Sequence, residues 1–144
     1  MAEEFGGPYL QMAILCQNVL QEASGQLSFI RITDALSIAG PLKEMQPATI
    51  TLFAVVGFKA GFAHGKYEIK VNGITPSKNE FMTVNQAVYF EGEDRGVNAI
   101  FVLSLALPEE GVYWFDVLLQ DVVTTRMPLR VLYQQIVQGF PGAG

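Results

Sequence analysis

The sequence predicts an all-β protein, an antiparallel β-sandwich of about eight strands with an immunoglobulin-like or related topology. Short segments rich in β-branched and aromatic residues, several alternating with period two, are separated by turns of Gly, Pro, Asn and Asp. No segment carries an apolar stripe at helical spacing over three turns. The length of 144 residues suits one domain. We therefore expect an N-terminal arm at residues 1–8, a single sandwich domain at 9–137 and a Gly/Pro tail at 138–144.

The expected strands follow one another through short connections. Residues 66–71 alternate most cleanly, with apolar residues on one side and charged residues on the other. Asn72 and Gly73 are typical of a tight turn because both tolerate positive φ, and residues 91–96 are expected to form a polar turn. Residues 132–138 are compatible with one helical turn. The strands are expected at residues 9–20, 27–38, 48–60, 66–71, 81–90, 97–107, 111–120 and 122–136.

The composition favours a protein with an apolar surface. Half of the residues are hydrophobic and 16% are charged, against about 25% charged in an ordinary soluble domain. Such a chain either has a sparse surface or keeps an apolar patch for a partner. The formal net charge is −5 and the Lys and Arg residues are scattered, which argues against nucleic acid and anionic membranes as partners.

The sequence also bears on location. One cysteine, Cys16, rules out an internal disulfide framework. The acidic start MAEEFGGPY lacks the basic and apolar regions of a signal peptide, and no run of about 18 apolar residues offers a membrane span. We expect a cytoplasmic protein.

The residues able to do catalysis are few. His64, the single histidine, is expected in a solvated loop, and Cys16 lies on an apolar strand face, so neither forms an obvious nucleophilic pair. Glu91, Glu93 and Asp94 gather oxygens in one turn, but their spacing is unlike that of a dedicated calcium loop. We expect no enzyme activity, no cofactor and no metal.

Asp34 is the most unusual carboxylate. Its position in the segment 27–38 gives it the same parity as the apolar Ile30 and Leu36. We expect a structural role for Asp34, either as a buried, hydrogen-bonded polar group or as the mark of a bulge.

The stretch GVYWFDVLLQ, residues 111–120, carries the main functional hypothesis because it is apolar on both faces. In an immunoglobulin-like sandwich it would lie beside residues 48–60 and 97–107. The core faces would hold Ile50, Leu52, Ala54 and Val56; Ala99, Phe101, Leu103 and Leu105; and Tyr113, Phe115, Val117 and Leu119. The outer faces would hold Phe53, Val55, Ile100, Val102, Trp114 and Leu118, which are our candidate interface residues.

We therefore predict a non-catalytic module that associates through this outer face with another protein, most simply as a homo-oligomer with a second copy of itself, or as a subunit of a larger assembly. The chain could instead cover the patch with its N-terminal arm, the loop at 40–47 or its C-terminal turn. A ligand- or metal-binding sandwich that uses loops 41–47, 63–65 and 91–96 is the main alternative. A hydrolase built on His64 and a ubiquitin-like conjugated tail ending at Gly144 are more remote ones.

A resemblance supports the sandwich. Gly25-Gln26-Leu27, Asp34 and the series Pro108, Gly111, Tyr113 and Phe115 resemble the motifs of a family of small bacterial proteins known only as a domain of unknown function. Leu15 fits the Leu/Ala-rich first strand of that family. The resemblance implies a β-sandwich and no known activity.

Overall fold

The computed structural model describes residues 6–137, and all its regular elements are β-strands. The all-β class is confirmed. No part of residues 6–137 is helical, so no helix long and apolar enough to cross a membrane occurs there. The strands are β1 (Tyr9–Gln21), β2 (Leu27–Ile32), β3 (Ala35–Gly40), β4 (Ala48–Ile74), β5 (Glu80–Leu107), β6 (Gly111–Leu119) and β7 (Val122–Gln135).

Two very long strands dominate the fold. β4 has 27 residues and β5 has 28, and they pair as one antiparallel hairpin along almost their whole length. Where the sequence predicts four strands, the chain therefore forms two. The predicted turn at Asn72-Gly73 is wrong, because these residues pair with Thr83 and Met82 in the ladder. The hairpin turns instead at residues 75–79, where the Thr75 N–H donates to the Asn79 carbonyl.

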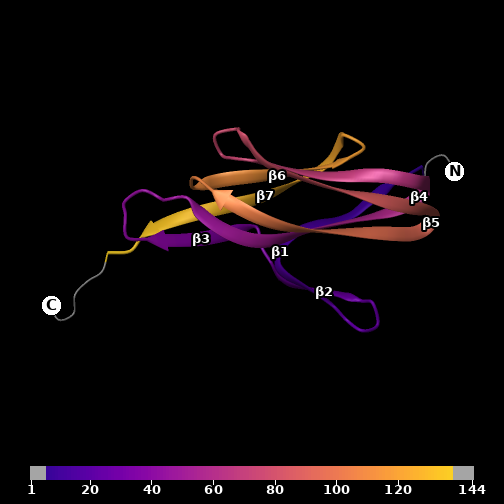
Figure 1. Ribbon diagram of the computed structural model, residues 1–144, viewed down its shortest axis with the longest axis horizontal. Helices are drawn as coiled ribbons and strands as arrows, with labels where there is room; N and C mark the ends of the chain where they lie inside the picture. Colours follow the sequence, from indigo (N-terminus) through magenta and orange to yellow (C-terminus); the bar gives the residue numbers. More distant parts are fainter. Residues whose placement is uncertain (1–5, 138–144) are drawn as a thin grey trace.

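The hairpin bends sharply at residues 61–65 and 91–96. The polar turn expected at 91–96 is this bend, and residues 91 and 93 stay paired with β4. Gly65 (φ 100°) and Gly92 (φ 85°) adopt backbone conformations that other residues disfavour. Both strands double back at the end of the molecule near the N-terminus (Figure 1). The one sheet thereby curls into a half-barrel with two facing layers.

The first layer contains β2, β1, residues 48–60 of β4 and residues 96–107 of β5. The second layer contains residues 80–91 of β5, residues 65–74 of β4, then β6, β7 and β3. Within residues 6–137 the sheet has seven strands where the sequence predicts about eight, and β3 pairs with β7 in parallel. The prediction that 48–60 and 97–107 are neighbours is confirmed, but 111–120 lies elsewhere, because β6 pairs with residues 69–74 of β4. Neither the eight-stranded sandwich nor the immunoglobulin-like topology is confirmed.

The core lies between the two layers. Phe58 of the first layer meets Phe90 of the second edge-on, with ring centroids 6.3 Å apart. Of the twelve predicted core residues, Ile50 is half-buried and the others are buried: Leu52, Ala54, Val56, Ala99, Phe101, Leu103, Leu105, Tyr113, Phe115, Val117 and Leu119. Strict alternation along each strand made these positions predictable.

The predicted strand at 27–38 is broken in two. Thr33 and Asp34 separate β2 from β3 as the chain crosses from the first layer to the second. Asp34 is exposed, so its prediction as a buried polar residue is wrong, and the alternative of a local irregularity describes it better. The helical turn predicted from residue 132 is also wrong, since β7 stays extended to Gln135; residue 138 lies outside the described residues.

Candidate functional site: the outer faces of the two layers

The six candidate interface residues do not form one patch. Phe53, Val55, Ile100 and Val102 lie in the first layer, whereas Trp114 and Leu118 lie in the second. Each layer buries its inner face against the other, so the two outer faces point in opposite directions. The expected continuous surface is therefore two surfaces.

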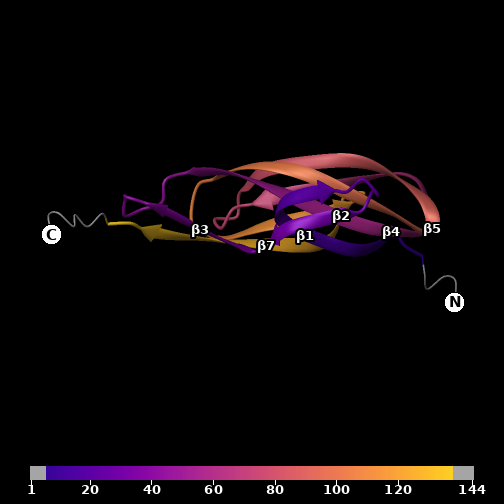
Figure 2. The same cartoon turned by 90° about the horizontal axis from the view of Figure 1, so that it is seen from below.

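The chain covers part of the first outer face itself. Val55 and Cys16 are 0% exposed, so Val55 cannot serve as a surface residue. The tip of the β1–β2 hairpin lies over this face, where Gly25 and Phe29 line a shared hollow with Asn98. Figure 2 shows β2 crossing in front of β1 and β4. Within residues 6–137, this coverage comes from the β1–β2 hairpin, which the sequence did not suggest; residues 1–5 of the N-terminal arm lie outside the described residues.

The uncovered part of this face is apolar. Cys16 pairs with both Ile32 and Phe53, and Phe53 pairs with Val102, so these residues form a row across four strands. Val102 is 61% exposed and Ile32 is 63% exposed. Phe53 and Ile100 are half-buried beside them. We call Ile32, Phe53, Ile100 and Val102 the first-layer patch.

Ile32 is a residue that the sequence did not single out. Its parity suggested a position beside other apolar side chains, but the break at Thr33 leaves it at the exposed end of β2. A short break inside an otherwise β-favouring segment has no strong sequence signal.

The second outer face is mixed: it is polar around Thr83 and Lys70, whereas Tyr89 and Trp114 are exposed elsewhere on it. Hydrogen bonds join Thr83 to Asn72 at 2.8 Å and Lys70 to Asp121 at 3.0 Å across its strands. Trp114 is partly exposed and Leu118 is half-buried. Trp114 lies in a groove of its own, with aliphatic walls and two cations. The groove is lined by Ile74, Thr75, Pro76, Lys78, Val112, Trp114 and Arg126.

Asp116 is a buried carboxylate that the sequence did not single out. It interrupts the apolar face of β6, and its side chain is only 10% exposed. The Arg126 Nε lies 3.2 Å from Asp116 Oδ1, although the angle does not make a hydrogen bond. The pair offsets the charge of a carboxylate that would otherwise be costly to bury.

The potential catalytic residues are not brought together. Cys16 is buried in the first layer, and burial raises the pKa of its thiol, which disfavours the reactive thiolate. His64 is exposed at the bend, opposite Glu91 in the ladder. Within residues 6–137, no three His, Cys, Asp or Glu side chains are grouped so as to hold a metal ion.

The end loops of the alternative ligand site are also apart. Residues 43–45 lie beside residues 108–110 and Tyr133. Residues 63–65 and 91–96 lie at the bend, at the other end of the molecule (Figure 1). They do not form one site.

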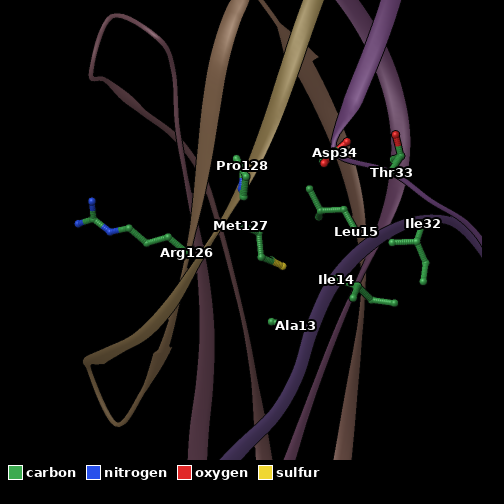
Figure 3. Close-up of a pocket in the computed structure, with 9 residues that line it drawn as sticks. All are labelled: Ala13, Ile14, Leu15, Ile32, Thr33, Asp34, Arg126, Met127 and Pro128. Atoms are coloured by element: carbon green, nitrogen blue, oxygen red, sulfur yellow. The ribbon is translucent and has the colours of Figure 1, made fainter.

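An open seam separates β1 from β7. A hollow of about 250 Å³ lies there, lined by residues of both strands and by Thr33 and Asp34 (Figure 3). Met127 points into it, whereas the Arg126 side chain points away (Figure 3). The hollow is smaller than the roughly 300–1,000 Å³ of typical small-molecule sites. Its geometry indicates no acid–base pair.

The fold and these surfaces define an all-β module whose first outer face carries an apolar patch and whose second outer face is mixed. The description "Family of unknown function (DUF6941)" matches residues 11–132, and the chain belongs to this family. A comparison with curated proteins finds no match. The resemblance to a family of unknown function is thereby confirmed.

Proposed function

We propose that the protein is a non-catalytic association module in which two copies meet through the first-layer patch. The observation that supports this proposal is the exposure of Val102 and Ile32 beside half-buried Phe53 and Ile100. Antiparallel sheets of monomeric proteins usually present polar side chains on the face that water reaches. The second outer face follows that rule around Thr83 and Lys70, and the first does not.

Burial of the exposed side chains of the first-layer patch would contribute enough free energy to support association. Burying an exposed Val or Ile side chain fully contributes about 1.5–3 kcal/mol, and each 1.4 kcal/mol is about a tenfold change in affinity. Val102 and Ile32 together therefore offer a binding contribution of several kcal/mol, part of which offsets the entropy lost on association.

The proposal departs from the sequence prediction in one respect. Trp114 and Leu118 lie on the opposite face and are not part of the proposed interface. The bacterial origin and the cytoplasmic location stay predictions. Gly144 and the conjugated-tail alternative lie outside the described residues.

Light scattering on a size-exclusion column tests the proposal. The native protein is expected to be a dimer at high micromolar concentration, and Val102→Glu is expected to weaken self-association at least about a hundredfold, because it buries a charge at the interface. Tyr89→Glu is the matched control: Tyr89 is 65% exposed and lies on the same strand, but in the second layer. It should leave the dimer unchanged. A native monomer, or equal loss in both variants, would refute the proposal.

A further inference from the structure

The second half of β5 is a free sheet edge. Within residues 6–137, β5 pairs with β4 alone, so one side of its backbone has no ladder partner. The stretch from Val97 to Leu107 contains no charged residue, no proline and no glycine. Natural sheets usually protect a free edge with such residues or with a short or irregular strand. A long unprotected edge is a template for pairing with another chain.

Other edges of the same sheet carry these protections. β2 and β3 are six residues each. The open edge of β7 contains Pro128, and Arg126 lies two residues before it. Arg130 donates its N–H to Asp34 on that side of β7, so the backbone nitrogen of Pro128 faces the same side and has no hydrogen to donate.

The first half of β5 is also an edge, and residues 81–90 likewise contain no charged residue, proline or glycine. Its side chains differ, because Thr83 and Asn85 bond to Asn72 and Glu68 of β4, although Tyr89 is exposed beyond them. The second half carries Ile100 and Val102. The edge strand of the first layer therefore supplies two of the four residues of the first-layer patch.

The ladder pattern shows which backbone groups are free. Leu15 accepts from Thr33 on the side away from β4, so its neighbours Ile14 and Cys16 direct their backbone groups to β4. Their partners Val55 and Phe53 then direct their backbone groups to β1, and Ala54 directs its backbone groups to β5. By the same alternation the backbone N–H and C=O groups on the open side of β5 belong to Asn98, Ile100, Val102, Ser104 and Ala106.

We propose that the open edge of β5, residues 97–107, pairs antiparallel with the same edge of a second copy around a two-fold axis at Val102. This inference rests on the proposed function and narrows it. Pairing of the edges brings Ile100 and Val102 of the two copies side by side on one continuous face, whereas Ile32 lies three strands from this edge and does not reach the second copy. With the axis at Val102, the eleven-residue uncharged stretch pairs with itself from end to end. Val102 lies opposite Val102 of the second copy, and Ile100 lies opposite Ser104.

The free backbone groups favour the antiparallel direction. With the axis at Val102, the residues whose N–H and C=O groups point to the open side of β5 lie opposite one another in the two copies, as hydrogen-bonded antiparallel pairs require. The charges beyond the ends do not decide the direction, because this register brings Arg95 toward Glu109 of the second copy but also Asp94 toward Glu110.

The variant Ser104→Pro distinguishes a dimer that pairs through the β5 edges from a dimer that packs through the outer faces. It removes an N–H that points to the open edge, while it leaves the β4 ladder and the first-layer patch intact. Edge pairing predicts that folded Ser104→Pro is a monomer at concentrations where the native protein and the control Ser104→Thr are dimers. If Ser104→Pro stays dimeric while Val102→Glu is monomeric, the edge inference is wrong and the proposed function stands. A native monomer overturns both.

A crosslinking measurement keeps the inference testable if the proline variant does not fold. Val102→Cys should be joined efficiently into covalent dimers by a short bismaleimide, because the two positions face each other across the axis. Ala106→Cys should not be joined, since the two copies of residue 106 would be roughly 27 Å apart at about 3.4 Å per residue. The native protein, with its buried Cys16, is the background control. Equal crosslinking of the two variants, or none in Val102→Cys, would overturn the inference.

Discussion

Tyr113 ties the start of β6 to the turn that follows β5. Its side chain is 0% exposed, and its hydroxyl donates to the Glu109 carbonyl at 2.5 Å and accepts from the Glu109 N–H at 3.1 Å. Its ring packs edge-on against Phe81, with centroids 5.5 Å apart. Tyr113→Phe therefore keeps the packing and removes both hydrogen bonds.

The expected loss of stability follows from these two bonds. An intramolecular hydrogen bond contributes about 0.5–1.5 kcal/mol net, so Tyr113→Phe should lower the free energy of unfolding by about 1–3 kcal/mol. With a urea slope of about 2 kcal/mol per molar, the midpoint should fall by about 0.5–1.5 M. Urea unfolding followed by circular dichroism measures this at a fixed protein concentration. The control Tyr89→Phe changes an exposed tyrosine and should leave the midpoint nearly unchanged.

The same residue makes stability depend on pH. Burial raises the pKa of Tyr113, an effect that its hydrogen bond to Glu109 partly opposes. The unfolded tyrosine, with a pKa of about 10, therefore loses its proton before the folded one does. Its contribution is complete below about pH 10 and declines as the pH rises through the folded pKa. The difference in urea midpoint between native protein and Tyr113→Phe should become smaller above pH 10. If Tyr113→Phe has the native midpoint at neutral pH, or if the difference in midpoint grows as the pH rises, this reasoning is contradicted.

Three further predictions concern other parts of the molecule. Gly111→Ala should cost more stability in urea than Gly25→Ala, by about 1 kcal/mol or more, because both have positive φ but only at Gly111 would the new Cβ lie 2.8 Å from the ring of Pro76; equal costs would show that the turn tolerates the contact. Cys16 should resist a thiol reagent in the folded protein and react in urea, because its thiol is buried and its pKa is raised; rapid labelling of the folded protein would contradict the burial. The fluorescence of Trp114, the single tryptophan, should not change as the protein is diluted through its dimer range, since it lies on the second layer; a shift on dilution would place the interface there instead.

The sequence was sufficient for the class of fold and for the core. Alternation along residues 97–107 and 111–119 identified the buried faces because the side-chain period of a strand is two and does not depend on the partner strand. The same reasoning recognised that these strands carry apolar residues on both faces.

The sequence was insufficient for the pairing of strands, which decides the site. The sequence predicts loops at 63–65 and 91–96, yet Gly61, Gly65 and Gly92 allow a continuous hairpin to bend there and carry β5 into both layers. That bend separates Trp114 from Val102. No local pattern distinguishes a bend within a paired hairpin from a loop between two strands, because glycine suits both.

The sequence also did not predict which outer-face residues the chain itself buries. Val55 has the parity of an outer-face residue, yet it is buried, and the tip of the β1–β2 hairpin lies over the same face near Lys59 and Asn98. The exposure of Ile32 depends on a break at Thr33. Both are consequences of tertiary packing.

Amide hydrogen exchange as a function of protein concentration tests the central claim most directly. The N–H groups of Ile100, Val102 and Ser104 point to the open edge of β5, whereas those of Phe101 and Leu103 point to β4. From micromolar to near-millimolar concentration, the first three amides should pass from rapid to slow exchange, and the other two should be protected throughout. If Ile100, Val102 and Ser104 exchange at the same rate across that range, the copies do not pair through this edge.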